Sequence, residues 1–597
     1  MVALLRPRRP RTFPHDDVAL VTLSTLKSHL PWLAAVVGIV IVATWPLVPT
    51  LGSAAVGHPY GDLPDHYWGT WWFGHELLNG RLPLHTNLSH FPETLSLWYI
   101  DPVGALLALP GRVLGFPADW NLLVLGQVLL GSFAGYLVGQ DVAEDHAGGL
   151  LSAVVVGVSP YVIGLIHSGL SEYLGLAPTT LYVWLLLRTL GYDPRGRPPP
   201  RWGVPGCAIL LGLGGAQAVY YLLFGALFAL STLPGAGWRA RVWPLVQVHV
   251  GAVILAAPLV FGSLSALGAG GAVTALNAPG WASRLPATDL LTFIRPGAWY
   301  FPDTPAEGNP GILHVNYLGW VALILAALAA RGAFARVGLL YGVFSLGPRL
   351  AFAKQVVTVG GMSVIFPFGL LCFPGSPFAS IHQPYRMVAL LLPWLGMAAA
   401  RGVARLPRRV RPFVAALALL ETILVSPAPW PLVTRPATVP AVYAEIDAAS
   451  PAAASPAAAS PDTASAGSGA ILDWPPDGST WNRDYLMWAT THGRPIPYGV
   501  NVFLGASLRA DPLVDALLRA REDLEKTARN RDVPFPGPVR VRPSGKSSRL
   551  AALGFSSIVV HKAALTGKEW ARTAGLLREA FGGPTFEDLD VAVWAVR

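Results

Sequence analysis

Residues 31–50 read PWLAAVVGIVIVATWPLVPT and contain no charged side chain. About 20 residues of α-helix cross the hydrocarbon core of a bilayer, so this run is long enough to span it. A cleaved signal peptide would have a shorter apolar core ending at a small-residue site, for which Ser53-Ala54-Ala55 is a weak candidate. The run therefore predicts an uncleaved first transmembrane helix.

The composition of the whole chain indicates a membrane protein. Of its 597 residues, 53% are hydrophobic and only 13% are charged, and the mean hydropathy is +0.47. A soluble protein carries roughly 25% charged residues, so these few charges could not cover the surface of a soluble fold of this size. The net charge of +9 does not indicate nucleic acid, because the arginines lie in short clusters between apolar runs. Two cysteines, Cys207 and Cys372, form neither a disulfide framework nor metal-ligand spacing.

Apolar runs recur along the chain, and arginine clusters separate them. The runs lie near 119–139, 147–166, 173–190, 203–235, 244–266, 316–330, 337–350, 387–400 and 413–428. Residues 203–235 have arginines on both flanks, so by the positive-inside rule this stretch enters and returns, with Gln217 near its apex. The result is about eleven spans, with the N-terminus inside and the C-terminus outside. Asp141, Glu144 and Asp145 break the pattern, because their assigned cytoplasmic turn contains no Lys or Arg.

The predicted fold is mainly α, a polytopic helical membrane protein with a small C-terminal α/β soluble domain. Its parts are a cytoplasmic N-terminal arm (1–29), a transmembrane domain (30–429), a Pro/Ala/Ser-rich linker (430–469) and an extracytoplasmic α/β domain (470–597). Three outer segments are large: 51–118, 267–315 and 348–386. In the first, DHYWGTWWFGHELLNG (65–80) predicts an amphipathic helix lying along the membrane surface.

The terminal domain alternates strand and helix patterns. ILDWP, SSIVVH and DVAVWAVR are typical of strands, and RADPLVDALLRAREDLEKTARN and EWARTAGLLREAF are typical of helices. Its role is open between acceptor binding, a lid over the site and structural packing.

The sharpest local signal is Gly61-Asp62-Leu63-Pro64-Asp65-His66-Tyr67-Trp68, about ten residues beyond the first span. A carboxylate just outside the membrane suits a base that acts on a substrate held at the lipid surface. The alternative is that Asp62 caps the following helix and Asp65 is simply solvated. The second outer loop, His167-Ser168-Gly169-Leu170-Ser171-Glu172-Tyr173, supplies a second carboxylate, Glu172.

This pattern resembles the GT-C class of membrane glycosyltransferases, which use sugars attached to polyprenyl phosphates and include protein O-mannosyltransferases and lipid A aminoarabinose transferases. Their catalytic carboxylate lies in the first outer loop, often with a second acidic residue in the next. The chain looks most like uncharacterised bacterial multispanning proteins with a GD-x-x-x-x-x-W start and an SPY…H-x-G third helix. The corresponding stretches are Gly61-Asp62…Trp68 and Ser159-Pro160-Tyr161…His167-Ser168-Gly169. The resemblance covers roughly residues 30–430 in architecture, through short motifs.

The resemblance implies catalytic carboxylates, with Asp62 as the general base and Asp65 as the runner-up. His66, His167 and Glu172 would line the same cavity, although His167 could equally be a satisfied interfacial histidine. A divalent cation would bind if Asp62 and Glu172 converge, but no ligand cluster in the sequence requires a metal, and no other cofactor is implied.

A lipid-phosphate donor requires a cationic site on the same face. The candidates are Arg386, together with Gln383, in Ile381-His382-Gln383-Pro384-Tyr385-Arg386, and Arg295 in FIRPGAWY. Related chains have an RVP-x-R-like element at the first position, and its first arginine is missing here. Arg386 could instead be an interfacial anchor. Lys354 and Arg349 are weaker alternatives.

The expected function is hexosyl or pentosyl transfer, inverting, from a polyprenyl-phosphate sugar to a lipid, glycan or protein acceptor. It would take place at the outer face of the cytoplasmic (inner) membrane, with membrane lipids and no nucleic acid as partners. One alternative is a transporter, which places ionisable residues near the bilayer midplane. The spans contain almost no charge, Glu421 being the chief exception. Another alternative is an inactive GT-C-like scaffold in envelope assembly.

Overall fold

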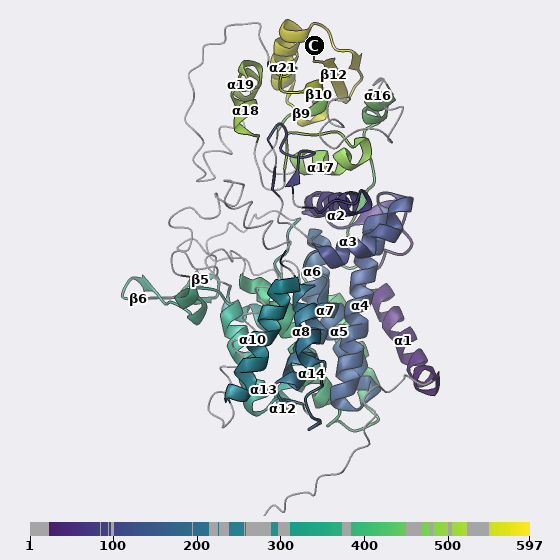
Figure 1. Cartoon of the computed structure of the whole chain (residues 1–597), viewed down its shortest axis with the longest axis vertical. Helices are drawn as coiled ribbons and strands as arrows, with labels where there is room; N and C mark the ends of the chain where they lie inside the picture. Colours follow the sequence, from purple (N-terminus) through teal and green to yellow (C-terminus); the bar gives the residue numbers. More distant parts are fainter. Residues whose placement is uncertain are drawn as a thin grey trace, which may run out of the picture.

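A bundle of helices forms one end of the molecule, and a small α/β domain forms the other (Figure 1). The computed structural model describes residues 23–83, 85–93, 95–96, 101–193, 195–213, 225, 238–255, 257, 288–296, 311–372, 384–448, 469–476, 481–499, 504–521 and 549–596. The bundle helices are α1 (Leu23–Ala43), α4 (Ala118–Ala143), α5 (His146–Gly157), α6 (Pro160–Ser168), α7 (Leu176–Thr189), α8 (Gly203–Gly212), α10 (Trp238–Leu255), α12 (Trp320–Ala329), α13 (Gly332–Ser345), α14 (Val388–Val403) and α15 (Arg411–Val425).

Three helical stretches among the described residues are long and apolar enough to cross a membrane: 118–143, 146–168 and 384–403. The stretch 146–168 is entirely buried and lies at the centre of the bundle. It comprises α5 and α6, which meet at Ser159, because the residue before Pro160 avoids helical geometry. The other expected runs form shorter helices in the described residues. Gln217 and most of the expected 203–235 pair lie outside the described residues.

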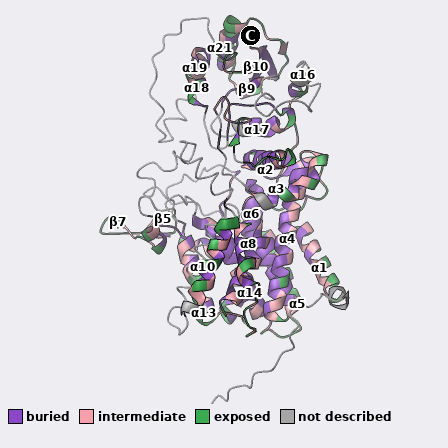
Figure 2. Ribbon diagram, in the orientation of Figure 1, coloured by how far each residue is buried: buried purple, intermediate pink, exposed green. Residues whose placement is uncertain are grey.

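The first outer segment does not contain the half-exposed amphipathic helix that the sequence predicts. Its helix α2 (Leu63–Leu78) has twelve buried residues of sixteen, distributed around all its sides. The reason is that α2 is covered on two faces, by the bundle and by α17 (Trp481–His492) of the terminal domain (Figures 1 and 2). The segment continues through α3 (Pro102–Ala108) and the 3-10 helix η1 (Leu109–Leu114) to α4.

The terminal domain contains a four-stranded sheet in the order β11-β12-β10-β9. Its strands are β9 (Ala470–Trp474), β10 (Phe555–His561), β11 (Phe586–Glu587) and β12 (Val591–Ala595), and β9 and β10 run parallel. Its helices are α16 (Val442–Ala448), α17, α18 (Ala506–Arg509), α19 (Pro512–Arg519), η9 (Lys562–Ala564) and α21 (Gly567–Phe581). Thr566 and Glu569 form a capping box that starts α21. The expected helix over 509–530 is described only to 521, and it is interrupted between α18 and α19.

Backbone pairing joins the terminal domain to the first outer segment. The N–H of Phe91 donates to the Ile496 carbonyl (3.0 Å), and the N–H of Ile496 donates to the Leu88 carbonyl (3.0 Å). Strand β1 (Ala54–Val56) also pairs antiparallel with β8 (Thr434–Pro436). The linker expected from residue 430 therefore begins later, because β8 and α16 are packed elements. Residues 449–468, which carry its Pro/Ala/Ser repeats, lie outside the described residues.

The acidic turn after α4 lies beside the arginine-rich turns, which explains why it carries no cation of its own. Asp141 accepts hydrogen bonds from Arg195 (2.8 Å) and Arg197 (2.6 Å), and Asp145 accepts one from Arg411 (2.5 Å). At the other end of α4, Asp119 contacts Tyr67 of α2. The 22 steps of about 1.5 Å from residue 119 to residue 141 correspond to roughly 33 Å of helix. The arginine-rich end and the end that carries α2 are thus about one hydrocarbon thickness apart.

Candidate active site at the outer end of the bundle

Asp62 stands at the N-cap position of α2, where the first outer segment contacts the end of α6. Its carboxylate makes no capping hydrogen bond, and the residue is partly exposed. Its backbone N–H donates to the Ser168 carbonyl (2.7 Å). Two glycines permit this contact: a Cβ on Gly61 would lie 2.7 Å from the Ser168 carbonyl oxygen, and one on Gly169 (φ +72°) would clash with the Leu63 backbone. Gly61-Asp62 and His167-Ser168-Gly169 thus pack against each other, and this contact fixes the backbone position of Asp62.

His66, one turn into α2, connects that helix to the second outer loop. Its Nδ1 accepts the backbone N–H of Ser171 (3.1 Å) and lies 3.2 Å from the Ser171 hydroxyl. Glu172 Oε2 lies 3.5 Å from the same nitrogen. Because Nδ1 accepts a backbone hydrogen bond, the ring is a neutral Nε2–H tautomer, and its contact with Glu172 is not an ion pair.

Arg386 forms the ion pair with Glu172, the second predicted carboxylate. Its Nη1 donates to Oε1 at 3.2 Å, and the side chains are 12% and 8% exposed. The guanidinium also lies over the Tyr173 ring, 4.3 Å from its centroid. The burial argues against an exposed interfacial anchor. Arg386, the cation that the sequence suggests for binding a lipid phosphate, is therefore held by Glu172 and Tyr173.

Two further side chains complete this end of the bundle, and the sequence analysis did not single them out. His314, which precedes α12, forms a hydrogen bond through its Nδ1 with the hydroxyl of Tyr385 in η8 (Pro384–Met387). Burial, and secondarily the nearby Arg386, lowers the pKa of His314 to about 3, so this ring is neutral. Asp62 is connected to Arg386 through α2, because His66 of that helix lies 3.5 Å from Glu172 and Glu172 pairs with Arg386.

Asp101 is a carboxyl group that sequence reasoning missed. It accepts hydrogen bonds from the Gly104 N–H (2.9 Å) and from Gln127 Nε2 (2.9 Å), and it interacts with Ser171 and Glu172. Burial raises the pKa of Asp101 to about 6, and the charge of Glu172 adds to that shift. The sequence could have indicated Asp101 only as the N-cap of a helix, α3. Its proximity to Glu172 depends on the tertiary fold.

The remaining predicted residues are placed differently. Asp65 is 5% exposed and His167 is 4% exposed, so neither is a solvated side chain. The His167 carbonyl accepts the N–H of His58 (2.7 Å), and the two rings lie 4.9 Å apart. Arg295 is exposed in the turn after η5 (Leu290–Phe293), and Gln383 lies outside the described residues. Within the described ranges, no group of three His, Cys, Asp or Glu side chains could hold a metal ion.

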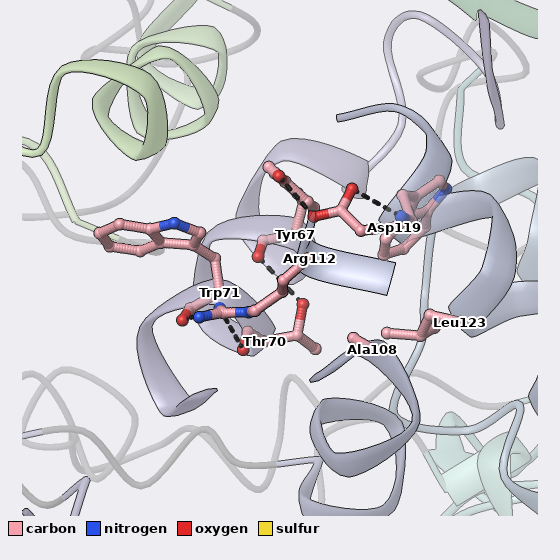
Figure 3. A pocket seen from close by; sticks show the side chains of 8 residues that line it. Tyr67, Thr70, Trp71, Ala108, Arg112, Asp119 and Leu123 are labelled. Atoms are coloured by element: carbon pink, nitrogen blue, oxygen red, sulfur yellow. Dashed lines mark hydrogen bonds between the residues drawn. The ribbon is translucent and has the colours of Figure 1, made fainter. Parts of the chain in front are cut away.

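A small depression lies between α2, η1 and α4, and Figure 3 shows its lining. Its polar groups are bound to one another or to backbone: Tyr67 donates to Asp119 (2.9 Å), and Arg112 donates to the carbonyls of Thr70 (3.2 Å) and Trp71. Burial, and then Asp119, raises the pKa of Tyr67 above its usual range, so the hydroxyl remains a neutral donor. Since none of the predicted site residues lines this pocket, we assign it to packing beneath the terminal domain.

Glu421, the charge that the transporter alternative depends on, has a structural role. Its carboxylate accepts the backbone N–H groups of Trp320 (2.6 Å) and Val321 (3.2 Å) and the hydroxyl of Tyr317. These N–H groups belong to the first turn of α12, which has no side-chain cap of its own. Glu421 of α15 therefore caps a neighbouring helix.

No protein-family model matches the sequence, and no curated protein matches it. Similar solved structures include the archaeal oligosaccharyltransferase AglB from Archaeoglobus fulgidus with an inhibitory peptide and a dolichol phosphate (TM-score 0.44, 12% identity, 94% of this chain and 72% of that chain). The arabinofuranosyltransferase AftD from Mycobacteria (0.45, 16%, 95% and 41%) and ArnT from Cupriavidus metallidurans bound to undecaprenyl phosphate (0.47, 10%, 95% and 98%) are also similar. All three are GT-C glycosyltransferases. Because each TM-score is below 0.5, the residue assignments rest on contacts within this chain.

Proposed function

We propose that this chain is a membrane glycosyltransferase that moves a sugar from a polyprenyl-phosphate donor to an envelope acceptor. The observation that carries the proposal is a chain of contacts at one end of an apolar bundle, which connects a carboxylate, Asp62, with a largely buried cation, Arg386. Asp62 begins α2, and His66 of the same helix lies 3.5 Å from Glu172, the ion-pair partner of Arg386. Asp62 and Arg386 come from the first and the last large outer segments of the sequence. A base and a phosphate-binding cation on one face are what this reaction requires.

In this reaction Asp62 is the general base. Its carboxylate removes the proton from an acceptor hydroxyl, the hydroxyl oxygen attacks the anomeric carbon, and the bond to the lipid phosphate breaks with inversion. Asp62 is the better candidate than Asp65 because it is partly exposed, whereas Asp65 is 5% exposed. Arg386 binds the departing phosphate, whose negative charge replaces part of the interaction with Glu172.

The two ends of α4 support an orientation of the chain in the membrane. The arginine-rich turns occupy the end opposite the candidate site, roughly 33 Å away along the helix. With those turns in the cytoplasm, the site and the terminal domain face outward. A phosphatase fused after Arg597 should then be active outside the cytoplasmic membrane, and activity of that fusion only in the cytoplasm would reverse the orientation.

The reaction can be tested with purified protein and a panel of radiolabelled polyprenyl-phosphate sugars. We expect Asp62→Asn to lower the transfer rate by about 10²–10⁴-fold, the usual contribution of a general base. The series includes Asp65→Asn and Glu172→Gln, and Glu144→Gln is the matched control, because Glu144 is exposed at the opposite end of the bundle. Equal transfer by the wild type and Asp62→Asn would remove Asp62 as the base. A panel in which no donor is consumed would favour the inactive scaffold.

A further inference from the structure

Two small β-hairpins project from the bundle between α13 and η8. The first pairs β4 (Ala351–Phe352) with β5 (Gln355–Val356), and the second pairs β6 (Thr358–Val359) with β7 (Met362–Ser363). The turns Ala353-Lys354 and Gly360-Gly361 have positive φ at both positions, as in the tightest two-residue hairpins. In Figure 1 these strands extend sideways from the bundle, across its long axis and level with α6.

The hairpins expose apolar side chains at a density unusual for a loop. Val359 and Met362 face each other across the Gly-Gly turn and are 68% and 75% exposed. Phe352, Ile365 and Leu370 are 50%, 65% and 72% exposed. These five side chains fall within 19 residues outside the bundle helices. Water contact over such a stretch is unfavourable unless another phase or molecule covers it.

All charged side chains of the same segment are cations. Residues 349–372 contain Arg349 and Lys354 and no Asp or Glu. An apolar surface with cations and no anions suits the headgroup–acyl boundary of a bilayer that contains anionic lipid.

The hairpins are held in this direction by contacts with described residues. Ala351 bridges Asp289, Arg349 bridges Ile365, and the Asp289 carboxylate accepts the N–H of Lys354. The N–H of Val364 donates to the Val357 carbonyl (2.9 Å), which ties the second hairpin to the first. These contacts therefore fix the position of the exposed turn at Gly360-Gly361 relative to the bundle.

We propose that residues 351–365 form a lipid wedge, which inserts the Val359 and Met362 side chains into the outer leaflet beside the bundle. The bilayer is the occupant that fits best, because the wedge points along the plane that a membrane around the bundle would occupy. It lies at the same end as Asp62 and Arg386. The inference rests on the bundle being embedded in a membrane and does not depend on the glycosyltransferase reaction.

The full-length protein tests this in nanodiscs of phosphatidylcholine and phosphatidylglycerol (7:3). With Cys207 and Cys372 replaced by alanine, a single cysteine is introduced as Met362→Cys or Val359→Cys and labelled with an environment-sensitive fluorophore. The matched control is Leu589→Cys, an apolar residue 93% exposed beside β12 of the terminal domain. Each probe is quenched by a lipid carrying a nitroxide near its headgroup and, separately, by aqueous iodide.

The wedge predicts blue-shifted emission at 362 and 359, with quenching by the lipid nitroxide at least threefold greater than at 589 and weaker quenching by iodide. If the probes at 359 and 362 both show the same emission and quenching as the probe at 589, the proposal is wrong. Protection from both quenchers would also overturn it, because that result places a protein surface, such as a second copy of the chain, over the hairpins. Two positions are used so that a local disturbance at either one is recognised.

Discussion

Arg386 Nη1 lies 3.2 Å from Glu172 Oε1, although 214 residues separate the two in the chain. The pair joins the second outer loop to the start of α14, and it lies against His66 and Tyr173. Glu172 thus holds the Arg386 guanidinium at the end of the bundle that carries α2. The donor phosphate proposed above would therefore compete with Glu172 for Arg386.

The first prediction concerns the stability of this pair. Removing one partner of a buried ion pair leaves an uncompensated charge and commonly costs about 3–5 kcal/mol. We expect Glu172→Gln and Arg386→Gln each to lower the free energy of unfolding by about 2–4 kcal/mol, and the double variant to lose at least about 1 kcal/mol less than the sum. Denaturant titration in detergent micelles measures this. The control is Asp515→Asn, which breaks an exposed pair with Arg519 and should change stability by about 0.5 kcal/mol or less. Additive losses would contradict the coupling.

The second prediction concerns the glycine that lets α6 meet α2. Gly169→Ala puts a Cβ against the Leu63 backbone at a residue whose φ is +72°. The left-handed conformation alone costs roughly 1–2 kcal/mol, and the clash adds to it. We expect a lower melting temperature and, in the donor assay, a loss of transfer per folded molecule, since the backbone of Asp62 is displaced. Gly175→Ala is the control, because that glycine has φ −69° and open space around it. Equal behaviour of the two variants would show that the contact does not position Asp62.

The third prediction is a pH dependence caused by Asp101. Its pKa of about 6 in the fold lies above the ordinary 3.8, so the fold favours the protonated form. Stability from this group is complete below pH 3.8 and is lost as the pH rises through about 6. At about 1.4 kcal/mol per pKa unit the loss is at most about 3 kcal/mol. Asp101→Asn should remove this slope, with the Gln127 amide turned to offer its oxygen.

Thermal unfolding of the wild type and Asp101→Asn between pH 4 and 8 measures the difference. The advantage of the variant should grow from pH 4 to pH 6 and then stay constant. Parallel curves over the whole range would mean that Asp101 titrates in the fold as it does in the unfolded chain.

The fourth prediction separates the structural role of Glu421 from a transport role. Glu421→Ala removes the acceptor for two α12 N–H groups and the Tyr317 hydroxyl, and each of these exposed or partly buried hydrogen bonds contributes about 0.5–1.5 kcal/mol. We expect a clear loss of stability with unchanged sugar transfer per folded molecule. Leu424→Ala, at an exposed position of the same helix, should have a much smaller effect. Loss of a measurable solute flux at unchanged stability would instead favour the transporter alternative.

Much of the site could be predicted because its motifs lie next to spans. Asp62 and Glu172 each follow an apolar run, and the alternation of arginine clusters predicts that such positions lie on the same face of the membrane. Asp101 and His314 carry no such signal, since a capping aspartate and a loop histidine occur everywhere. The surroundings of α2 were predicted wrongly for a similar reason. Its aromatic residues are those of an interfacial helix, and nothing local to them indicates that α17 packs on top.

Composition and periodicity by themselves determined that this is an apolar helical bundle with a soluble domain, because the need to hide apolar side chains from water acts on every residue locally. They also predicted that Asp62 and Glu172 lie on one side of the membrane. Only the tertiary structure decided that Arg386 pairs with Glu172, that Asp101 joins them and that Glu421 caps a neighbouring helix. Each of these depends on a single contact between distant segments, and helix packing, which leaves no periodic trace in the sequence, brings those segments together.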